Sequence, residues 1–364
     1  MPSPLPSALR PPPSAFCPLP SYSMSRSIYY QAASLALSLV FIAVVIVLVG
    51  GSPTEVVTYM WSGAFGTADQ FARVVATLAP LLLCASGLLF TFTAGLYNLG
   101  IEGQIVLGGI ASMVPIRLFQ DVLPAPMVIV LAIAAGALGG MLWGLLAGAL
   151  KVYGRIDEIF AGVGLNFVAD GLALYLIFGP WKKPGVASMS GTEQFNEAIW
   201  LPTFGKTEAS PVALAIALAV LILTIVVMRG TYFGLRLRAV GHSLRASYVL
   251  GIPSIRQLLS SFAICGVFAG IAGSLQVLAV FHRLIPSISS NLGFLALLIA
   301  LLAGSNAWLL LPIAFFFSAL NIGSLQLPLS LDLESSLSGV IQGTLVLFAL
   351  LGRGFSEMNK AAKT

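Results

Sequence analysis

Apolar stretches long enough to cross a lipid bilayer recur along almost the whole chain. A membrane-spanning helix needs about 20 predominantly apolar residues. Segments of this kind lie near 28–50, 74–96, 102–119, 126–149, 157–178, 211–228, 257–280, 291–304, 307–325 and 335–352. Of the 364 residues, 58% are hydrophobic and 9% are charged, whereas soluble domains carry about 25% charged residues. The chain is therefore expected to be an all-α polytopic membrane protein with about ten transmembrane helices.

The eighth and ninth segments are the least distinct of the ten. Gly304-Ser305-Asn306 separates 291–304 from 307–325, and one long helix or a pair of short helices would both fit this region. Moving one span in or out of the count would place the two termini on opposite sides of the membrane.

Lys and Arg indicate the orientation of the chain. Ten spans place both termini, with 12 of the 18 Lys and Arg residues, on the same side. Because cytoplasmic loops carry the excess of basic residues, we expect the N- and C-termini to be cytoplasmic. The same rule places the basic segment 229–256 in the cytoplasm.

The N-terminal residues differ from the rest of the chain. Eight of the first 20 residues are proline, which prevents helix formation. We interpret 1–27 as a disordered cytoplasmic tail, with Met24 as a candidate true start, 28–355 as the transmembrane domain, and 356–364 as a second cytoplasmic tail. Cys17, Cys84 and Cys265 are far apart, so their spacing indicates neither a metal site nor a disulfide framework.

Glycines spaced four residues apart predict close helix packing. Gly136, Gly140, Gly144 and Gly148 form one ridge, and Gly266 and Gly270 repeat the spacing in a later span. Small residues at this interval allow helices in lipid to approach closely. We interpret these ridges as structural.

Polar side chains within apolar spans are costly and often mark a functional site. Three groups of residues qualify. The first contains Asn98, Glu102 and Gln104, the second contains Asn166 and Asp170, and the third contains Ser305 and Asn306. The functional interpretation is a polar lining for a solute path. Alternatively, Glu102 caps the N-terminus of its own span, and Asp170 is a hydrogen-bonded link between helices.

Enzyme chemistry has little support in the sequence. His242 and His282 fall on opposite sides of the membrane in the ten-span arrangement, and no metalloprotease, serine hydrolase or paired-carboxylate pattern is present. A phosphate-binding GxxxxGK[ST] loop is also absent. We therefore assign no catalytic or metal-binding residue, and no cofactor, to this chain.

The segment 229–256 combines basic, apolar and small residues. Between Ser243 and Gly251 the pattern favours a short helix along the membrane surface, ended by Gly251 and Pro253. Such a helix could dock in a groove of a partner protein. The alternative is an ordinary basic cytoplasmic loop.

Several motifs resemble a known family. Gly95-Leu-Tyr-Asn-Leu-Gly-Ile-Glu-Gly-Gln104 resembles the FNIGxEGQ signature of permease subunits in ATP-binding-cassette importers for sugars, nucleosides and branched-chain amino acids. Leu237-Arg-Ala-Val-Gly-His-Ser-Leu-Arg-Ala-Ser-Tyr-Val-Leu-Gly-Ile252 is similar to the coupling segment of that family, although His242-Ser243 replaces the usual Asn-Pro. Gly293-Phe-Leu-Ala-Leu-Leu-Ile-Ala-Leu-Leu-Ala-Gly304 matches a third stretch. Asp157–Asn166 and Tyr175–Trp181 resemble the nucleoside or simple-sugar branch.

This resemblance implies the permease subunit of an importer in the plasma (inner) membrane. It implies a cytoplasmic ATPase that binds the ATP, a second permease subunit (a homologue or a second copy) and an extracytoplasmic substrate-binding lipoprotein, with membrane lipid around the pore and no nucleic acid. In this interpretation Asn98, Glu102, Gln104, Asn166, Asp170 and Asn306 line the pathway, and Arg238, Gly241, Arg245, Ser247 and Gly251 couple to the ATPase. The alternative function is a stand-alone channel or ion-coupled carrier for a small polar solute.

Overall fold

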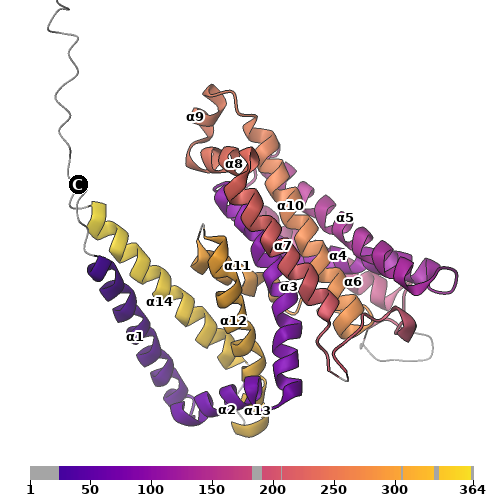
Figure 1. Ribbon diagram of the computed structural model, residues 1–364, viewed down its shortest axis with the longest axis horizontal. Coiled ribbons are helices and arrows are strands. Elements are labelled where there is room, and N and C mark those ends of the chain that lie inside the picture. The colour runs from indigo at the N-terminus through magenta and orange to yellow at the C-terminus, as the bar shows by residue number, and fades with distance from the viewer. Residues whose placement is uncertain (1–23, 183–190, 206, 305, 332–335, 362–364) are drawn as a thin grey trace, which may run out of the picture.

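The structure, a computed structural model, describes residues 24–182, 191–205, 207–304, 306–331 and 336–361, and these residues contain helices and no strand (Figure 1). The helices of the first half are α1 (Met24–Leu48), α2 (Pro53–Phe65), α3 (Ala68–Thr93), α4 (Ile101–Phe119), α5 (Ala125–Val152) and α6 (Glu158–Phe178). The helices of the second half are α7 (Pro211–Gly230), α8 (Tyr232–His242), α9 (Leu244–Val249), α10 (Ser254–Leu275), α11 (Leu292–Ala303), α12 (Leu310–Ser324), α13 (Gln326–Leu331) and α14 (Ser336–Ala361). A π-helical segment, η3 (Gln276–Phe281), extends α10, and the short 3-10 turns η2 (Glu197–Ile199) and η4 (Ala307–Leu309) lie in loops.

Each of the ten apolar segments coincides with a helix of the structure. Among the described residues, seven helices are long and apolar enough to cross a membrane, or eight if the bent pair of α1 and α2 forms one span. The helix α11 and the stretch 336–352 of α14 are apolar but shorter. The chain is thus a multi-pass, all-helical membrane protein, as predicted, whereas the count of ten spans stays a prediction.

Several helix ends differ from the predicted boundaries. The helix α1 begins at Met24, inside the tail predicted for 1–27, and the rest of that tail lies outside the described residues. The helix α14 continues to Ala361, past the predicted boundary at 355. Between α1 and α2 the chain bends by 102° because Gly50 adopts a left-handed φ of +88° and Pro53 starts a new helix.

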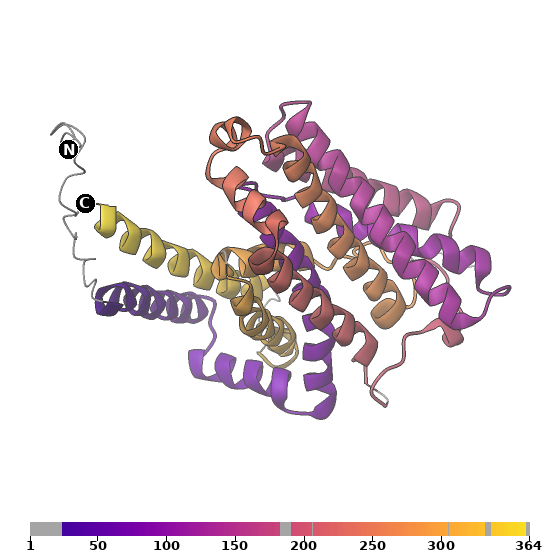
Figure 2. The same cartoon turned by 45° about the horizontal axis from the view of Figure 1, so that its top comes forward.

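The helices form a central bundle with a separate pair at its edge. The helix α10 packs against α3, α4 and α5, while α6 lies on α4 and α7 lies on α3. The helices α1 and α14 lie side by side and diverge from the bundle (Figures 1 and 2). Their contact with α2 and α13 forms a small second core that includes Ile42, Val56 and Leu327.

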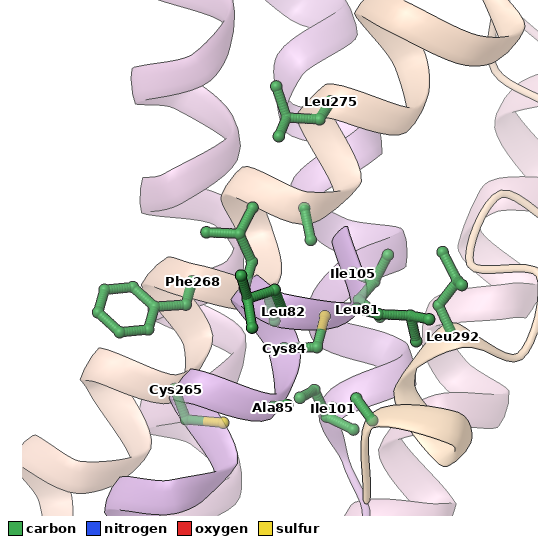
Figure 3. Packing of buried hydrophobic residues seen from close by; sticks show 14 of the residues in the cluster. Leu81, Leu82, Cys84, Ala85, Ile101, Ile105, Cys265, Phe268, Leu275 and Leu292 are labelled. Atoms are coloured by element: carbon green, nitrogen blue, oxygen red, sulfur yellow. The ribbon is translucent and has the colours of Figure 1, made fainter. Parts of the chain in front are cut away.

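The two glycine ridges pack against each other. A Cβ atom added to Gly140 would overlap with the carbonyl oxygen of Gly266, and one added to Gly270 would overlap with that of Gly136. The backbones of α5 and α10 therefore touch along their glycine faces, which is the close packing that the spacing predicts. The surrounding apolar core includes Cys84, Cys265 and Phe268 (Figure 3).

The basic segment contains the predicted short helix. The helix α9 begins after Ser243, whose Oγ accepts a hydrogen bond from the N–H of Ala246 at 3.3 Å. The chain leaves α9 through Gly251, which has a left-handed φ of +77°. Both α8 and α9 lie at the same end of the bundle (Figure 1).

The region 291–325 contains two separate helices, α11 and α12, rather than one long helix. Gly304 ends α11 with a φ of +60° and a ψ of −127°, a conformation that strongly favours glycine. Asn306 then caps η4 by accepting the N–H of Trp308 on its Oδ1 at 3.4 Å. Ser305, which was grouped with Asn306 in the sequence, lies outside the described residues.

Candidate functional site

The loop between α3 and α4 is held by a buried amide pair. The Nδ2 group of Asn98 donates to Oε1 of Gln104 at 3.2 Å, and Nε2 of Gln104 donates to Oδ1 of Asn98 at 3.3 Å. Nδ2 of Asn98 also lies 3.1 Å from Sγ of Cys265 on α10. Both amides are almost completely buried, so this pairing satisfies groups that would otherwise be costly to bury.

Asn166 connects α6 to the same loop. Its Oδ1 accepts the N–H of Gly103 at 2.8 Å, and its Nδ2 donates to the carbonyl of Leu99 at 3.0 Å. The approach is close because Gly100 and Gly162 face each other, and a Cβ on either would crowd the backbone of the other. The segment 98–104 is thereby fixed between α6 and α10.

Glu102 projects from the first turn of α4 towards the start of α11. Its Oε1 accepts the N–H of Phe294 at 3.0 Å, and its Oε2 is buried with no hydrogen-bond partner among the described residues. The neighbouring Ile101 and Leu292 lie in the apolar core (Figure 3). Glu102 thus supplies an acceptor to the N-terminus of another helix, α11, and it also lies in the first turn of its own helix, where a carboxylate suits the helix dipole.

Asp170 lies on the same helix as Asn166 but on an exposed face. Its side chain is exposed, and no described residue forms a hydrogen bond or ion pair with it. The nearby side chains of Phe167 and Tyr175 are 73% and 66% exposed. Gly171 has no neighbouring atom within 4 Å of an added Cβ. This face of α6, defined by these residues and Gly164, has no partner among the residues that the structure describes.

Asn306 lies apart from the other polar residues. Its Oδ1 accepts a hydrogen bond from Nη2 of Arg229 at 3.3 Å. Both residues line a cavity of about 780 Å³, together with Arg238 and Gly241 of α8. The structure therefore brings together Asn98, Glu102, Gln104 and Asn166, with Asp170 on the outer face of α6, and places Asn306 beside the basic segment.

The residues predicted to couple to an ATPase fall into two groups, one that makes contacts within the chain and one that is exposed. Nη2 of Arg238 donates to the carbonyl of Met228 at 2.9 Å, and Oγ of Ser247 donates to the carbonyl of Ser243 at 2.8 Å. Arg245 is exposed on α9 and Gly251 has open space around it.

Gly241 contacts the loop that follows α3. A Cβ on Gly241 would overlap with the carbonyl oxygen of Thr93, and a Cβ on Gly95 would lie 3.3 Å from the carbonyl oxygen of Gly241. The basic segment therefore touches the chain only a few residues before Asn98. Sequence analysis missed Thr93 and Arg229, because neither belongs to a motif. The position of Arg229 at the end of an apolar span was the one available signal.

At the opposite end of α10, the loop 191–205 is bound to the backbone after η3. The N–H groups of Thr192 and Phe195 donate to the carbonyls of Leu284 and His282 at 2.9 and 3.3 Å. The ring of Trp200 stacks on His282 with centroids 3.9 Å apart. Burial lowers the pKa of His282, while its hydrogen bond with the carbonyl of Leu278 acts in the opposite direction.

Comparison with known proteins places these features in a family. The model of the family described as "branched-chain amino acid transport system / permease component" matches residues 70–350. The chain is similar to the guanosine ABC transporter permease protein NupP of Bacillus subtilis, with 27% identity over 84% of this chain and 88% of NupP. It is 30% identical to NupQ, a second guanosine permease protein of that organism, over 75% of this chain and 88% of NupQ. The glucose ABC transporter permease protein TsgB13 of Haloferax volcanii is 27% identical over 80% of this chain and 78% of its own length. The chain belongs to the permease component family of branched-chain amino acid transport systems.

Proposed function

We propose that this chain forms one half of the pore of an ATP-driven importer for nucleosides or simple sugars. The contact of Gly241 with the carbonyl of Thr93 is the observation that carries the mechanism. It joins the basic segment, where an ATPase would act, to the loop that holds the buried polar residues. Relatives named as guanosine and glucose permease proteins support the cargo class.

The proposed topology has ten spans with both termini in the cytoplasm. A described helix at each of the ten apolar segments and the excess of Lys and Arg in the segment 229–256 support it. The shorter helices α11 and 336–352 count as spans here. The membrane is the plasma membrane, and the basic segment faces the ATPase.

The polar pathway follows the α6 face and the start of α4. Asp170 is exposed in the middle of an apolar span, and a carboxylate at the centre of a membrane helix costs about 2.5–3.5 kcal/mol by insertion scales. Contact with lipid is therefore unfavourable, and a second permease subunit across a hydrated path removes that cost. Glu102 and Asn166 lie behind this face, and the Oε2 atom of Glu102, which has no partner among the described residues, suits the hydroxyl and amide groups of uncharged cargo.

Motion would pass from the ATPase to the pathway through rigid contacts. Arg245 and Gly251 in and beside α9 form the docking surface, while Arg238 and Ser247 keep the segment rigid. A shift of α8 would press on Thr93 and displace the loop 94–100. Because Asn98 and Gln104 fix that loop to α10, the displacement would reach the pathway as a movement of helices between two packed states.

The remaining parts of the machine are separate proteins. A cytoplasmic ATPase binds and hydrolyses ATP, and an extracytoplasmic lipoprotein delivers the cargo. The permease chain itself carries no cofactor and catalyses no reaction. The resemblance of the motifs around Asn98 and Arg238 to those of importers supports these partners.

Reconstitution tests the proposal against a stand-alone channel. The chain is co-purified with its ATPase and lipoprotein, inserted into liposomes, and supplied with radiolabelled guanosine or glucose. We expect uptake only when ATP, the ATPase and the lipoprotein are all present. Uptake of either solute by the chain alone, without ATP, would show that it acts as an independent channel or carrier.

A further inference from the structure

A basic cavity opens at the end of the bundle that carries α8. Its volume is about 780 Å³, and its lining includes Arg229, Arg238, His242, Asn306 and Thr93. These residues come from the end of α3, the end of α7, the helix α8 and the break between α11 and α12. The cavity therefore lies where four segments of the chain meet.

The lining is basic, and none of its described residues carries a carboxylate. Among the residues that the structure describes, the ion pairs are Arg73 with Glu208 and Lys151 with Glu158, so neither arginine of the cavity is neutralised. Clefts lined by charges of one sign concentrate the electrostatic field and attract ions of the opposite sign.

Both arginines are held in place with donors to spare. Arg229 uses one nitrogen for Asn306, and Arg238 uses one for the carbonyl of Met228 at the end of α7. A guanidinium group has five N–H donors, so most of those on each arginine remain available. The Nδ2 donors of Asn306 also have no partner in the described part of the chain.

We propose that this cavity binds a phosphate group. The planar fork of arginine matches phosphate oxygens, and two anchored arginines with an amide donor provide several charge-assisted hydrogen bonds. The volume exceeds that of a free ion and lies within the range of about 300–1,000 Å³ typical of small-molecule sites. A phosphate monoester of nucleotide size would fit, and a lipid headgroup has the same chemistry.

A bound phosphate would connect helices that move relative to one another in the proposed mechanism. A phosphate bound by Arg229 and Arg238 would link the end of α7 to α8 and, through Asn306, to the break before α12. The assignment of the cavity to the cytoplasmic side rests on the proposed function. Binding itself does not, because it requires neither ATPase nor transport.

Calorimetry on the full-length chain in phospholipid-free maltoside micelles tests the site. The probes are adenosine 5′-monophosphate, inorganic phosphate and, as the uncharged match, adenosine. We expect the monophosphate to bind at least about tenfold more tightly than adenosine, and Arg229→Gln to weaken it by at least about tenfold, as the loss of a charge-assisted hydrogen bond predicts. Arg236→Gln is the matched control, because Arg236 is exposed on the same helix as Arg238 but does not line the cavity.

Nanodiscs distinguish the two sources of phosphate. If a headgroup is the occupant, phosphatidylglycerol will abolish the monophosphate binding seen in phosphatidylcholine discs, and Arg229→Gln will reduce the phosphatidylglycerol that co-purifies. Equal binding in both discs identifies a soluble phosphate ester.

The proposal is overturned if folded wild-type chain binds neither phosphate nor phosphatidylglycerol, if adenosine binds as tightly as the monophosphate, or if both arginine variants weaken binding equally. If the wild-type chain binds no phosphate and Arg229→Gln no longer associates with the ATPase, the cavity is assigned to an acidic protein partner instead.

Discussion

Glu102 and Asn166 both use side-chain oxygen atoms to bind backbone N–H groups of other helices. Glu102 accepts from Phe294 at the start of α11, and Asn166 accepts from Gly103 at the start of α4. The first N–H groups of a helix have no partner within that helix, so these contacts satisfy groups that are buried away from water. Each side chain thus stabilises the fold in addition to the role proposed for it in the pathway.

Replacing Glu102 separates these two roles. Glu102→Gln keeps an acceptor for the N–H of Phe294 and removes the charge, whereas Glu102→Leu leaves that N–H unsatisfied. We expect Glu102→Leu to destabilise the chain by about 1–3 kcal/mol, the usual cost of an unsatisfied buried donor, and Glu102→Gln to have a smaller effect. Thermal unfolding in detergent measures both.

Transport by the two variants completes the comparison. If Glu102 also lines the pathway, Glu102→Gln will reduce ATP-dependent uptake in the reconstituted importer while its unfolding temperature stays close to that of the wild type. Unchanged uptake by Glu102→Gln would assign the residue to structure alone.

His282 makes the attachment of the loop 191–205 sensitive to pH. Burial lowers the pKa of His282 in the folded state, and a released histidine titrates near its ordinary value of about 6.5. Protonation therefore favours release, so the attachment is at full strength above pH ~6.5 and weakens as the pH falls towards the lowered folded pKa. Between pH 7.5 and 5.5 we expect faster hydrogen exchange at the N–H groups of Thr192 and Phe195, which bind this backbone.

His282→Asn provides the control for this titration. His282 has a left-handed φ of +54°, and asparagine tolerates that conformation better than most residues but does not titrate. After correction for the intrinsic pH dependence of exchange, the variant should show no loosening over this range. The same loosening in both proteins would attribute the effect to another group.

At the scale of helices, Gly241 and Gly251 are required for different reasons. Gly241 has no room for a side chain against Thr93, whereas Gly251 has open space and a left-handed backbone. We expect Gly241→Ala to displace α8 and to uncouple ATP hydrolysis from uptake. Gly251→Asn, which suits a left-handed position and so keeps the backbone of the docking surface in place, should keep the two coupled.

The ratio of ATP hydrolysed to cargo imported measures this difference in proteoliposomes. The affinity of the lipoprotein for its cargo serves as the control and should not change in either variant. A variant at Gly241 that keeps the wild-type ratio would show that the contact with Thr93 does not transmit motion.

Elements with a local signal could be predicted from sequence, and contacts between distant residues could not. The ten apolar segments each became a helix because length and hydropathy are sufficient signals in lipid. The helix α9 was predictable from Ser243 and Gly251, since both caps are local. The helix α2 was missed because its 13 residues are fewer than a membrane span needs, and the contact of Asn98 with Cys265 depends on packing across the bundle.

For the whole molecule, the decisive question is what covers the exposed face of α6. The chain leaves Asp170 without a partner among its described residues, beside Gly164 and Gly171, which have open space. Association in lipid relies on small residues that allow close approach and on polar groups that find partners. Both conditions favour a second permease subunit at this face over lipid.

Cross-linking can identify that interface directly. Gly171→Cys, in a background with Cys17→Ser, places one accessible thiol on the face, because the native Cys84 and Cys265 are buried. Treatment of native membranes with a short bismaleimide should join Gly171→Cys to a second permease chain. The matched control is Gly343→Cys on α14, a glycine that also has open space but lies on the pair of helices away from the bundle.

Mass spectrometry of the product distinguishes a second copy from a homologue. Exposing Asp170 to lipid is unfavourable. Cross-linking at Gly343 but not at Gly171 would therefore mean that Asp170 is shielded from lipid without a second chain, and the pore would then have to lie inside the bundle.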